Sequence, residues 1–594
     1  MKRFLKKRTP IRILALLFLC LSLSSCNAPS KLFSSSVLRQ EQSSFDSYTD
    51  QLFMEEMQEN TINLHYTLSK PEDFGIKSHK ISLGSLSKDS SKNSRAAIEN
   101  ILARLSGFDY DALNGKQQLT YDILKDSCER ELSASPFYYY EEPLRPTTGI
   151  QSELPILLAE YAFYDSCDVT DYLALLTCLE DYFQEIALFE QEKSKEGLFM
   201  SPYAAETLIE ACKTFTKNPS ENYLIHTFNT RIDALDNISE EKKALYKRQN
   251  QSLVENAVIP AYENLTDLLA KLKNTGNNNA GLCGLPKGKE YYKYLVRTNT
   301  GSEKSIEELQ KQTKQQRRLD MERLQQILAT NPELLHADEN GLDFGEPEEI
   351  LNHLQKAMLS EFYPAANTSF EVNYVHQSLE DTLAPAFYLT APIDDISRNV
   401  IYLNKSSQYR GIQLFTTLAH EGYPGHMYQN SYFYSLDYPI LNKLLGCIGY
   451  TEGWAIFMEN KADRFLSNEK EAAWQKLLIY DTNISSIILA SVDIGIHYYG
   501  WDIDDCVDFF NSKLGSSVTS EDLAQLYDII LQTPGYYLYY IYSGQILKDL
   551  ETNAKDVLGD KFDEIEFNQA ILDSGPIGLD MVKRNIENYI DEKK

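Results

Sequence analysis

The chain has 594 residues, 43% of them hydrophobic, and a formal net charge of −29 at neutral pH. That length allows a large buried core, and no long Pro/Gly/Ser linker or charge block divides the chain beyond about residue 45. So acidic a chain is repelled by the phosphates of nucleic acids and by anionic lipid, so we expect no nucleic-acid partner.

The first 25 residues are typical of a secretory signal peptide. Met1–Arg8 is cationic, and Ile13–Ser25 is a largely apolar stretch too short to span a membrane, which takes about 20 residues. The segment runs into Leu-Ser-Ser-Cys, which resembles the lipobox of bacterial lipoproteins, whose cysteine is diacylated and becomes the mature N-terminus. We therefore expect removal of residues 1–25 and an extracytoplasmic protein anchored to the bacterial cell membrane through lipid on Cys26.

Two regions follow the signal. Residues 26–44 are Ser-rich and polar, which predicts a flexible tether, and residues 45–594 are predicted to form one large domain, the catalytic domain if the motifs below carry chemistry. Removing the six cationic residues of the signal takes the net charge of the mature chain to −35. The remaining cysteines are scattered singly, with no C-x-x-C pair, so neither a disulfide scaffold nor a Cys-type zinc site is expected.

The catalytic domain is predicted to be mainly helical. Asp171–Glu192 repeats apolar residues at three- and four-residue spacing, and helical patterns return from Gly411 to the end. Asn274–Gly288 is the one clear internal loop, which either separates two lobes or is a surface excursion of one body. Phe387–Thr390 and Asn399–Leu403 are short β-prone runs separated by a turn, which predicts a hairpin.

Two histidines, His420 and His426, flank a Pro-Gly pair. Zinc takes neutral imidazole and carboxylate ligands, and an adjacent glutamate, here Glu421, can act as general base on a zinc-bound water. In the usual H-E-x-x-H motif the histidines are four residues apart and share a helix face, whereas here they are six apart. Pro424-Gly425 interrupts the helix, so two residues could loop out and return His426 to the metal. Alternatively, the break is structural and the histidines merely cap and pack.

A third ligand is expected on a second helix. Glu452 follows His426 by 26 residues, which is far enough for the chain to turn back alongside the first helix. Glu459 is two turns further along the same face. It is either an alternative ligand or a hydrogen-bond partner of a ligand histidine.

The sequence HEGYPGH followed by TEGWA closely resembles the DUF885 family of bacterial proteins. That family looks like a distant relative of the zinc peptidases of the carboxypeptidase Taq (M32) and oligopeptidase (M3) families. Other segments look like the same family and extend the resemblance over most of the mature chain: Leu64–Ile76, Pro143–Pro155, Asp493–Trp501 and Thr533–Tyr540.

The resemblance implies a mainly α, M3/M32-like fold with a deep cleft and a short β-ribbon at its edge. One zinc ion on the floor of the cleft would be bound by His420, His426 and Glu452, and Glu421 would activate the water. The hairpin at 384–404 resembles the edge strand along which such enzymes hold an extended peptide by main-chain pairing.

Further catalytic residues are implied near the C-terminus. The segment that holds Tyr536, Tyr537 and Tyr540 is similar to a stretch of the oligopeptidases in which a tyrosine hydroxyl stabilises the oxyanion. Tyr540 is the first choice for this role and Tyr537 the second, although Ser543 stands where the family would have glycine. His497 is a candidate substrate contact; alternatively, it forms a plain intrahelical pair with Asp493.

These features predict a zinc-dependent oligopeptidase or carboxypeptidase that hydrolyses short peptides outside the membrane. Two other functions stay open. One is a peptide-binding lipoprotein that has lost catalysis, against which Glu421 argues because it supplies the base. The other is a zinc amidase that acts on a non-peptide amide.

Overall fold

Helices make up 74% of the described residues and strands 3%, as the expected mainly α fold requires. The structure, a computed structural model, describes residues 35–594 except 78, 147–148, 277–279, 336–341, 343, 366–368, 376, 378–379, 381–383 and 408. The predicted signal peptide, the lipidation site at Cys26 and residues 27–34 of the predicted tether lie outside the described residues.

The first helix reaches into the segment that we expected to be a flexible tether. α1 (Ser35–Glu59) begins ten residues before Phe45, so the tether prediction was wrong for residues 35–44. Tertiary contacts hold this polar stretch, because Glu41 accepts a hydrogen bond from the backbone of Asp109 and Gln42 donates one to the carbonyl of Ala112. A Ser-rich composition predicts a linker, but it does not reveal such contacts.

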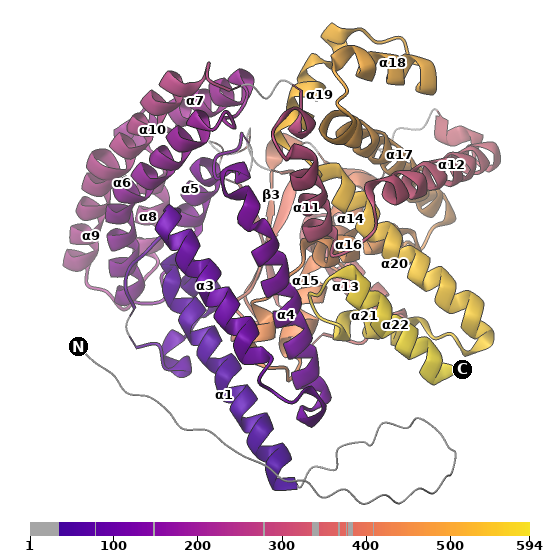
Figure 1. The fold of residues 1–594 in the computed structure, drawn as a ribbon, viewed down its shortest axis with the longest axis horizontal. Helices are drawn as coiled ribbons and strands as arrows, with labels where there is room; N and C mark the ends of the chain where they lie inside the picture. The colour runs from indigo at the N-terminus through magenta and orange to yellow at the C-terminus, as the bar shows by residue number, and fades with distance from the viewer. Residues whose placement is uncertain are drawn as a thin grey trace, which may run out of the picture.

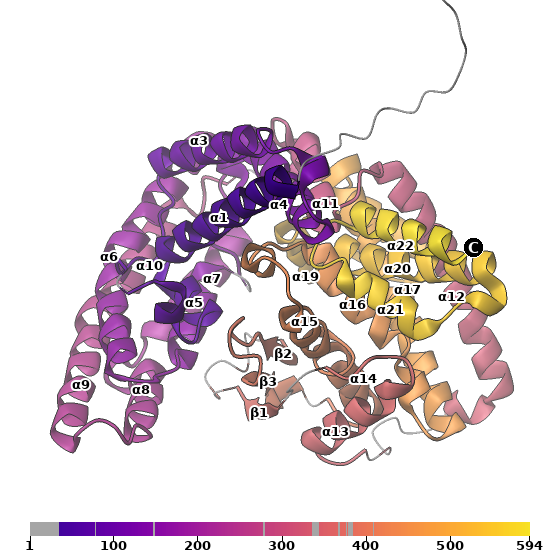
Figure 2. The same ribbon diagram turned by 90° about the horizontal axis from the view of Figure 1, so that it is seen from below.

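The first half of the chain forms a curved layer of helices, coloured indigo to magenta in Figures 1 and 2. After α1 its helices are α2 (Thr61–Thr67), α3 (Lys88–Leu105), α4 (Gly115–Ala134), α5 (Ile150–Glu160), α6 (Ser166–Lys195), α7 (Pro202–Thr216), α8 (Tyr223–Asp233), α9 (Glu240–Leu253) and α10 (Ile259–Leu272). Polar caps start several of them, such as Asp165 before α6 and Ser201 before α7. One hydrophobic core, drawn from residues between Ile62 and Leu269, holds most of this layer together.

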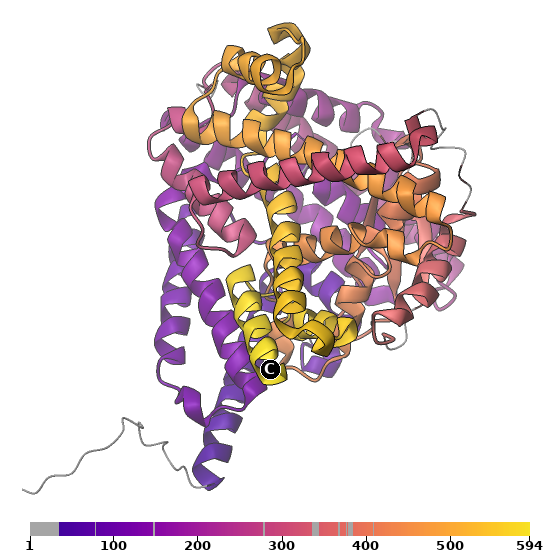
Figure 3. The ribbon, with the colours of Figure 1, turned by 90° about the vertical axis from the view of Figure 1, so that its right-hand side faces the viewer.

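The second half builds a larger helical body. Its helices are α11 (Gly288–Thr300), α12 (Ile306–Thr330), α13 (Pro347–Ala357), α14 (Gly411–Glu421), α15 (His426–Ser435), α16 (Ile448–Glu459), α17 (Glu469–Ile494), α18 (Ile503–Leu514), α19 (Ser520–Gln532), α20 (Tyr536–Leu558), α21 (Glu564–Asp573) and α22 (Leu579–Lys593). Figure 3 shows α12 lying across α20 and beside α17. A second hydrophobic core, mostly from residues after Leu282, fills this body.

The predicted loop at 274–288 connects α10 to α11 and so lies between these two cores. Residues 277–279 of it lie outside the described residues. Ile123, Phe137 and Tyr140, from the first half, pack into the second core and join the halves.

Helix α17 is continued by the π-helical turn Gly495–Tyr499. Judged by length and composition alone, it is the one helix in the described part of the chain that could cross a membrane. It packs against α12, α14 and α20. Its Asp493 side chain is fully buried and hydrogen-bonded to neighbouring elements, as expected for a core helix of the body.

A small sheet lies between the two helical halves (Figure 2). The predicted hairpin is confirmed as β2 (Ala386–Leu389), which pairs antiparallel with β3 (Asn399–Leu403). A third strand that we did not predict, β1 (Phe370–Tyr374), pairs parallel with β3. The alternation of apolar and polar residues in FEVNY is a period-two signal that could have revealed it. The strand order β1-β3-β2 leaves β2 at an edge of the sheet.

Candidate metal centre

The helix that carries His420 ends immediately after Glu421, and a new helix begins at His426. The break confirms that the Pro-Gly pair interrupts the helix. Gly425 is held tightly, because a Cβ atom there would lie 1.7 Å from the carbonyl oxygen of His420. The Trp454 indole of α16 donates a hydrogen bond of 2.8 Å to the carbonyl of Pro424 and fixes the segment from the other side.

The break brings three ligand-type side chains to one point. The candidate ligand atoms of His420, His426 and Glu452 lie within 4.8 Å of one another. Oε2 of Glu452 is 3.6 Å from Nε2 of each histidine. Ligand atoms about 2.0–2.2 Å from one tetrahedral zinc ion lie roughly 3.3–3.6 Å apart, so this spacing fits a metal ion better than direct hydrogen bonds.

Two further observations test whether these residues fit a cation. Oε2 of Glu452 is a buried acceptor without a hydrogen-bond partner among the described residues. Burial lowers the pKa of His420, but the carboxylates of Glu452, Glu459 and Glu421 outweigh it and hold that pKa well above 6.5. The cluster therefore carries an excess of negative charge that a divalent cation would neutralise. The residues fit zinc.

Glu459 lies behind His420 as a hydrogen-bond partner and outside the three-ligand group. Its Oε2 atom is 3.1 Å from Nδ1 of His420, so with a metal bound this carboxylate would hold the remaining ring proton on Nδ1 while Nε2 takes the metal. This arrangement resolves the two roles that the sequence left open for Glu459.

Glu421 lies between the histidines and the sheet edge. Its Oε2 atom accepts a hydrogen bond of 3.0 Å from the backbone N–H of Tyr388 in β2. Burial raises the pKa of Glu421 above 4.5, while the nearby histidines lower it. A carboxylate in this environment is a suitable proton acceptor. Tyr388, which sequence reasoning missed, thus links the edge strand β2 to the candidate metal centre.

The structure separates the two tyrosines proposed for the oxyanion. Burial raises the pKa of Tyr540 far above 10, and the Glu452 carboxylate adds to the shift, so Tyr540 lies near the candidate ligand. Tyr537 instead lies near Tyr536 and Asp493. Burial raises the pKa of Tyr537, and the charges of these two residues raise it further. Of the two proposed tyrosines, Tyr540 is therefore the one that the Glu452 carboxylate influences, and Tyr539, which we did not single out, is influenced by it as well.

Ser543 lies at the point where α20 packs closely against α16, the helix that carries Glu452. α16 and α20 pack closely, because a Cβ atom at Gly453 would lie 2.8 Å from the Cβ of Ser543. Ser543 is fully buried against the helix that carries Glu452, and Tyr540 is one turn earlier on the same helix. A small serine is thus compatible with the close helix contact where we expected glycine.

His497 lies away from this cluster, and its predicted role as a substrate contact is not supported. It is fully buried; its Nδ1 accepts a hydrogen bond from the backbone of Leu282, and its Nε2 is 2.8 Å from the carbonyl of Ile530. Both ring nitrogens are satisfied by backbone, so His497 ties the π-helical turn after α17 to α19 and to the 3-10 turn that begins at Leu282. The predicted intrahelical pair with Asp493 is not formed either, because Asp493 binds the Tyr292 hydroxyl and the N–H of Gly535.

Asp493 gives the protein a pH-dependent element of stability. Burial raises the pKa of Asp493 to about 7, against a usual 3.8. A carboxyl group whose pKa is higher in the folded state stabilises that state fully below its unfolded pKa and loses this effect as pH rises through the folded value. We expect Asp493→Asn, which keeps an acceptor for Gly535, to unfold at a temperature that depends less on pH between about 4 and 8. Calorimetry of both proteins at matched pH measures this; identical pH slopes would contradict it.

A cavity of about 1010 Å³ lies next to the metal centre, between the two halves of the chain. From the first half it is lined by Tyr140, Arg145, Glu153 and Met200; from the second by Pro385, Phe387, Ile448, Tyr536, Tyr537 and Tyr539, among others. Phe387 directly precedes the strand residue that binds Glu421, so the cavity reaches the strand that holds the general-base candidate, although Glu421 itself is not among the lining residues. A cavity of this size accepts a ligand of several residues.

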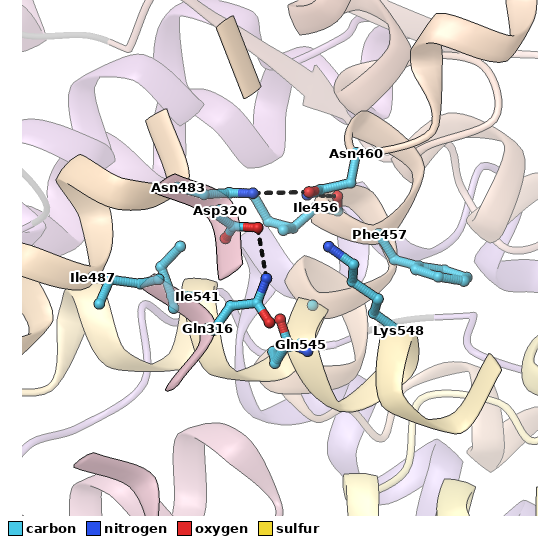
Figure 4. Close-up of a pocket in the computed structure, with 11 residues that line it drawn as sticks. Gln316, Asp320, Ile456, Phe457, Asn460, Asn483, Ile487, Ile541, Gln545 and Lys548 are labelled. Atoms are coloured by element: carbon cyan, nitrogen blue, oxygen red, sulfur yellow. Dashed lines mark hydrogen bonds between the residues drawn. The ribbon is translucent and has the colours of Figure 1, made fainter. Parts of the chain in front are cut away.

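A second, much smaller cavity lies between helices of the second half of the chain (Figure 4). It has a volume of about 20 Å³ and lies between α12, α16, α17 and α20. Gln316 donates a hydrogen bond to Asp320, and Asn483 donates one to Asn460 across the cavity. Its size suits about one water molecule, so this polar cluster joins helices and is not a substrate site.

Fold and site together define a class: a mainly helical protein with a buried His-His-Glu cluster, an adjacent glutamate and a large cavity. The family model of the DUF885 family, bacterial proteins of unknown function, matches residues 72–586. The chain belongs to this family.

Two solved structures share the fold. A candidate lipoprotein from Colwellia psychrerythraea matches with a TM-score of 0.80 at 18% identity, over 93% of this chain and 99% of that one. A candidate lipoprotein of unknown function from Shewanella oneidensis matches with a TM-score of 0.59 at 13% identity, over 91% of this chain and 99% of that one. No curated protein matches the chain significantly.

Proposed function

We propose that this protein is a zinc-dependent peptidase, with an M3/M32-like fold, that hydrolyses short peptides. The observation that carries the proposal is the convergence of His420, His426 and Glu452 on one point, with Glu421 beside them and bound to the edge strand β2. This is the donor set of a catalytic zinc site, three protein ligands with a neighbouring carboxylate.

Each residue has a distinct task in this mechanism. Zinc bound by the two Nε2 atoms and Glu452 would lower the pKa of a water molecule and polarise the scissile carbonyl. One carboxylate oxygen of Glu421 accepts a hydrogen bond from the N–H of Tyr388. The other oxygen would accept the proton of the attacking water and pass it to the leaving amine. The Tyr540 hydroxyl, kept protonated by burial, donates a hydrogen bond to the developing oxyanion.

The sheet edge favours a peptide over a non-peptide amide. β2 pairs with β3 on one side, and its other edge has no partner strand among the described residues, so an extended backbone could align there beside the Tyr388 N–H that Glu421 binds. Because the Tyr388 N–H on that edge binds Glu421, a peptide aligned along β2 would pass directly over the general base.

We also propose that the enzyme acts outside the cytoplasmic membrane, anchored by lipid on Cys26. The lipobox-like Leu-Ser-Ser-Cys supports this location. The two structural neighbours, both described as candidate lipoproteins, are consistent with it.

Purified protein is expected to hold one zinc ion per chain, which mass spectrometry of the metal content measures. Chelation should lower the unfolding temperature, since a ligand that binds only the folded state stabilises it, and added zinc should restore it. Glu459→Gln is a graded control, because it keeps the ligands but weakens the orientation of His420, and zinc affinity should fall by roughly 10- to 100-fold. Protein that stays metal-free in zinc-containing buffer would refute the proposal.

A further inference from the structure

The large cavity beside the metal centre holds one cationic side chain. Among its described lining residues the charged ones are Arg145, Glu142 and Glu153. Glu142 is already engaged, since it forms an ion pair of 2.7 Å with the buried Lys193. The Nε atom of Arg145 is buried and has no hydrogen-bond partner among the described residues, and none of their carboxylates forms an ion pair with it. Burial raises the pKa of Glu153 while the Arg145 cation lowers it, so this carboxylate balances part of the charge, and the unpaired Nε–H of Arg145 is left for a ligand to complete.

The backbone around Arg145 is tightly held. Gln151 donates a side-chain hydrogen bond to the Arg145 carbonyl. A Cβ atom at Gly149 would lie 2.2 Å from the Arg145 nitrogen, so the turn closes on this residue and only glycine fits there. A side chain on a fixed backbone loses less entropy when it binds a ligand, so Arg145 is preorganised. This turn belongs to the segment Pro143–Pro155, for which the proposed mechanism has no other use.

Arg145 and the metal centre share a neighbour. Tyr539 lines the cavity and precedes Tyr540 on α20. Burial raises the pKa of Tyr539 most. The charges of Tyr536 and Glu452 raise it further, whereas the Arg145 cation lowers it. Tyr539 lines the cavity together with Arg145, and its helix α20 packs along α16, which carries Glu452, so the cavity extends from Arg145 toward the candidate zinc ligand.

We propose that Arg145 binds a carboxylate group of the substrate, so that the protein selects short peptides that present a carboxylate in the cavity next to the cleaved bond. The inference rests on the proposed peptidase function. A guanidinium binds a carboxylate through two parallel hydrogen bonds and does not lose its charge. The carboxylate is either the peptide C-terminus or an Asp or Glu side chain. Glu153, which also lines the cavity, repels that carboxylate and limits affinity.

Binding, measured by titration calorimetry, tests this without turnover. The protein is the Glu421→Gln variant, and the probes are three N-acetylated alanine pentapeptides: a free acid, its C-terminal amide, and an amide with one glutamate. We expect one carboxylate peptide to bind roughly 10- to 100-fold more tightly than the neutral amide. Preference for the free acid identifies C-terminal recognition, and preference for the glutamate peptide identifies an acidic side chain.

Variants assign the preference to Arg145. Arg145→Gln should remove it, Arg145→Lys should keep part of it, and Glu153→Gln should strengthen it. Arg318→Gln, which removes an exposed arginine of α12, should leave it unchanged. Circular dichroism confirms that each variant is folded.

Several results would overturn the proposal: equal affinity for all three peptides, no binding of any, or a preference that survives in Arg145→Gln. Because these measurements need no hydrolysis, they stand apart from the test of the peptidase itself. A protein that discriminates carboxylates but cleaves nothing would refute the proposed function and leave Arg145 as a ligand-binding residue.

Discussion

Glu421→Gln is expected to lower the rate of peptide hydrolysis by roughly 10²–10⁴-fold while the zinc content stays the same. The amide cannot accept the proton of the attacking water, yet it is nearly isosteric and retains an oxygen for the N–H of Tyr388. Glu421 is outside the three-ligand group, so its replacement should leave metal binding intact. Rates with a mixed peptide library and metal analysis of the same preparations measure both quantities.

The matched control is Glu241→Gln, which removes an exposed glutamate from α9, far from the cluster, and should cleave like wild type. If Glu421→Gln is as active as wild type, the general-base role is wrong. If wild type binds peptides but cleaves none, the protein is a peptide-binding lipoprotein. If it cleaves only non-peptide amides, it is an amidase.

Gly425→Ala is expected to disrupt the metal centre and to destabilise the protein by about 2–4 kcal/mol. The added methyl group would lie 1.7 Å from the His420 carbonyl oxygen and 2.5 Å from that of Ala419, so backbone must move. That movement would displace His426, which begins the next helix, and break the bond from Trp454 to Pro424. Zinc affinity should therefore fall along with stability.

Gly446→Ala is the control for this substitution, because a Cβ atom there meets nothing within 4 Å. Chemical denaturation and zinc titration of both variants measure the effect. A Gly425→Ala protein with the zinc affinity and stability of wild type would show that the Pro-Gly segment does not hold the histidines in place.

The pattern of residues predicted the local structure well wherever local chemistry decides it. Apolar periodicity indicated the helices, and β-branched and aromatic runs indicated the hairpin. The Pro424-Gly425 pair indicated a helix break, because proline and glycine act on their own backbone. The failures arose where a distant contact decides: the last ten residues of the predicted tether are helical, and β1 was missed because it is stabilised by pairing with β3.

The amino-acid sequence alone shows which residue types are present for chemistry: two histidines, Glu421, Glu452 and a cluster of tyrosines near the C-terminus. The tertiary structure fixes how they are arranged, because metal binding and hydrogen bonding depend on distances between residues far apart in the chain. It placed Glu459 behind His420, put Tyr540 rather than Tyr537 beside Glu452, and buried His497 between backbone groups.

The role proposed for Arg145 likewise depends on the folded structure and could not be predicted from the sequence. In the sequence it is one arginine in a Pro-rich segment, with no spacing that relates it to the histidines 275 positions later. Packing of the two halves around one cavity places it in the cavity wall and leaves its Nε–H without a hydrogen-bond partner among the described residues. Burial and the absence of a partner are properties of the folded chain, since they depend on every element that surrounds the residue and not on its neighbours in sequence.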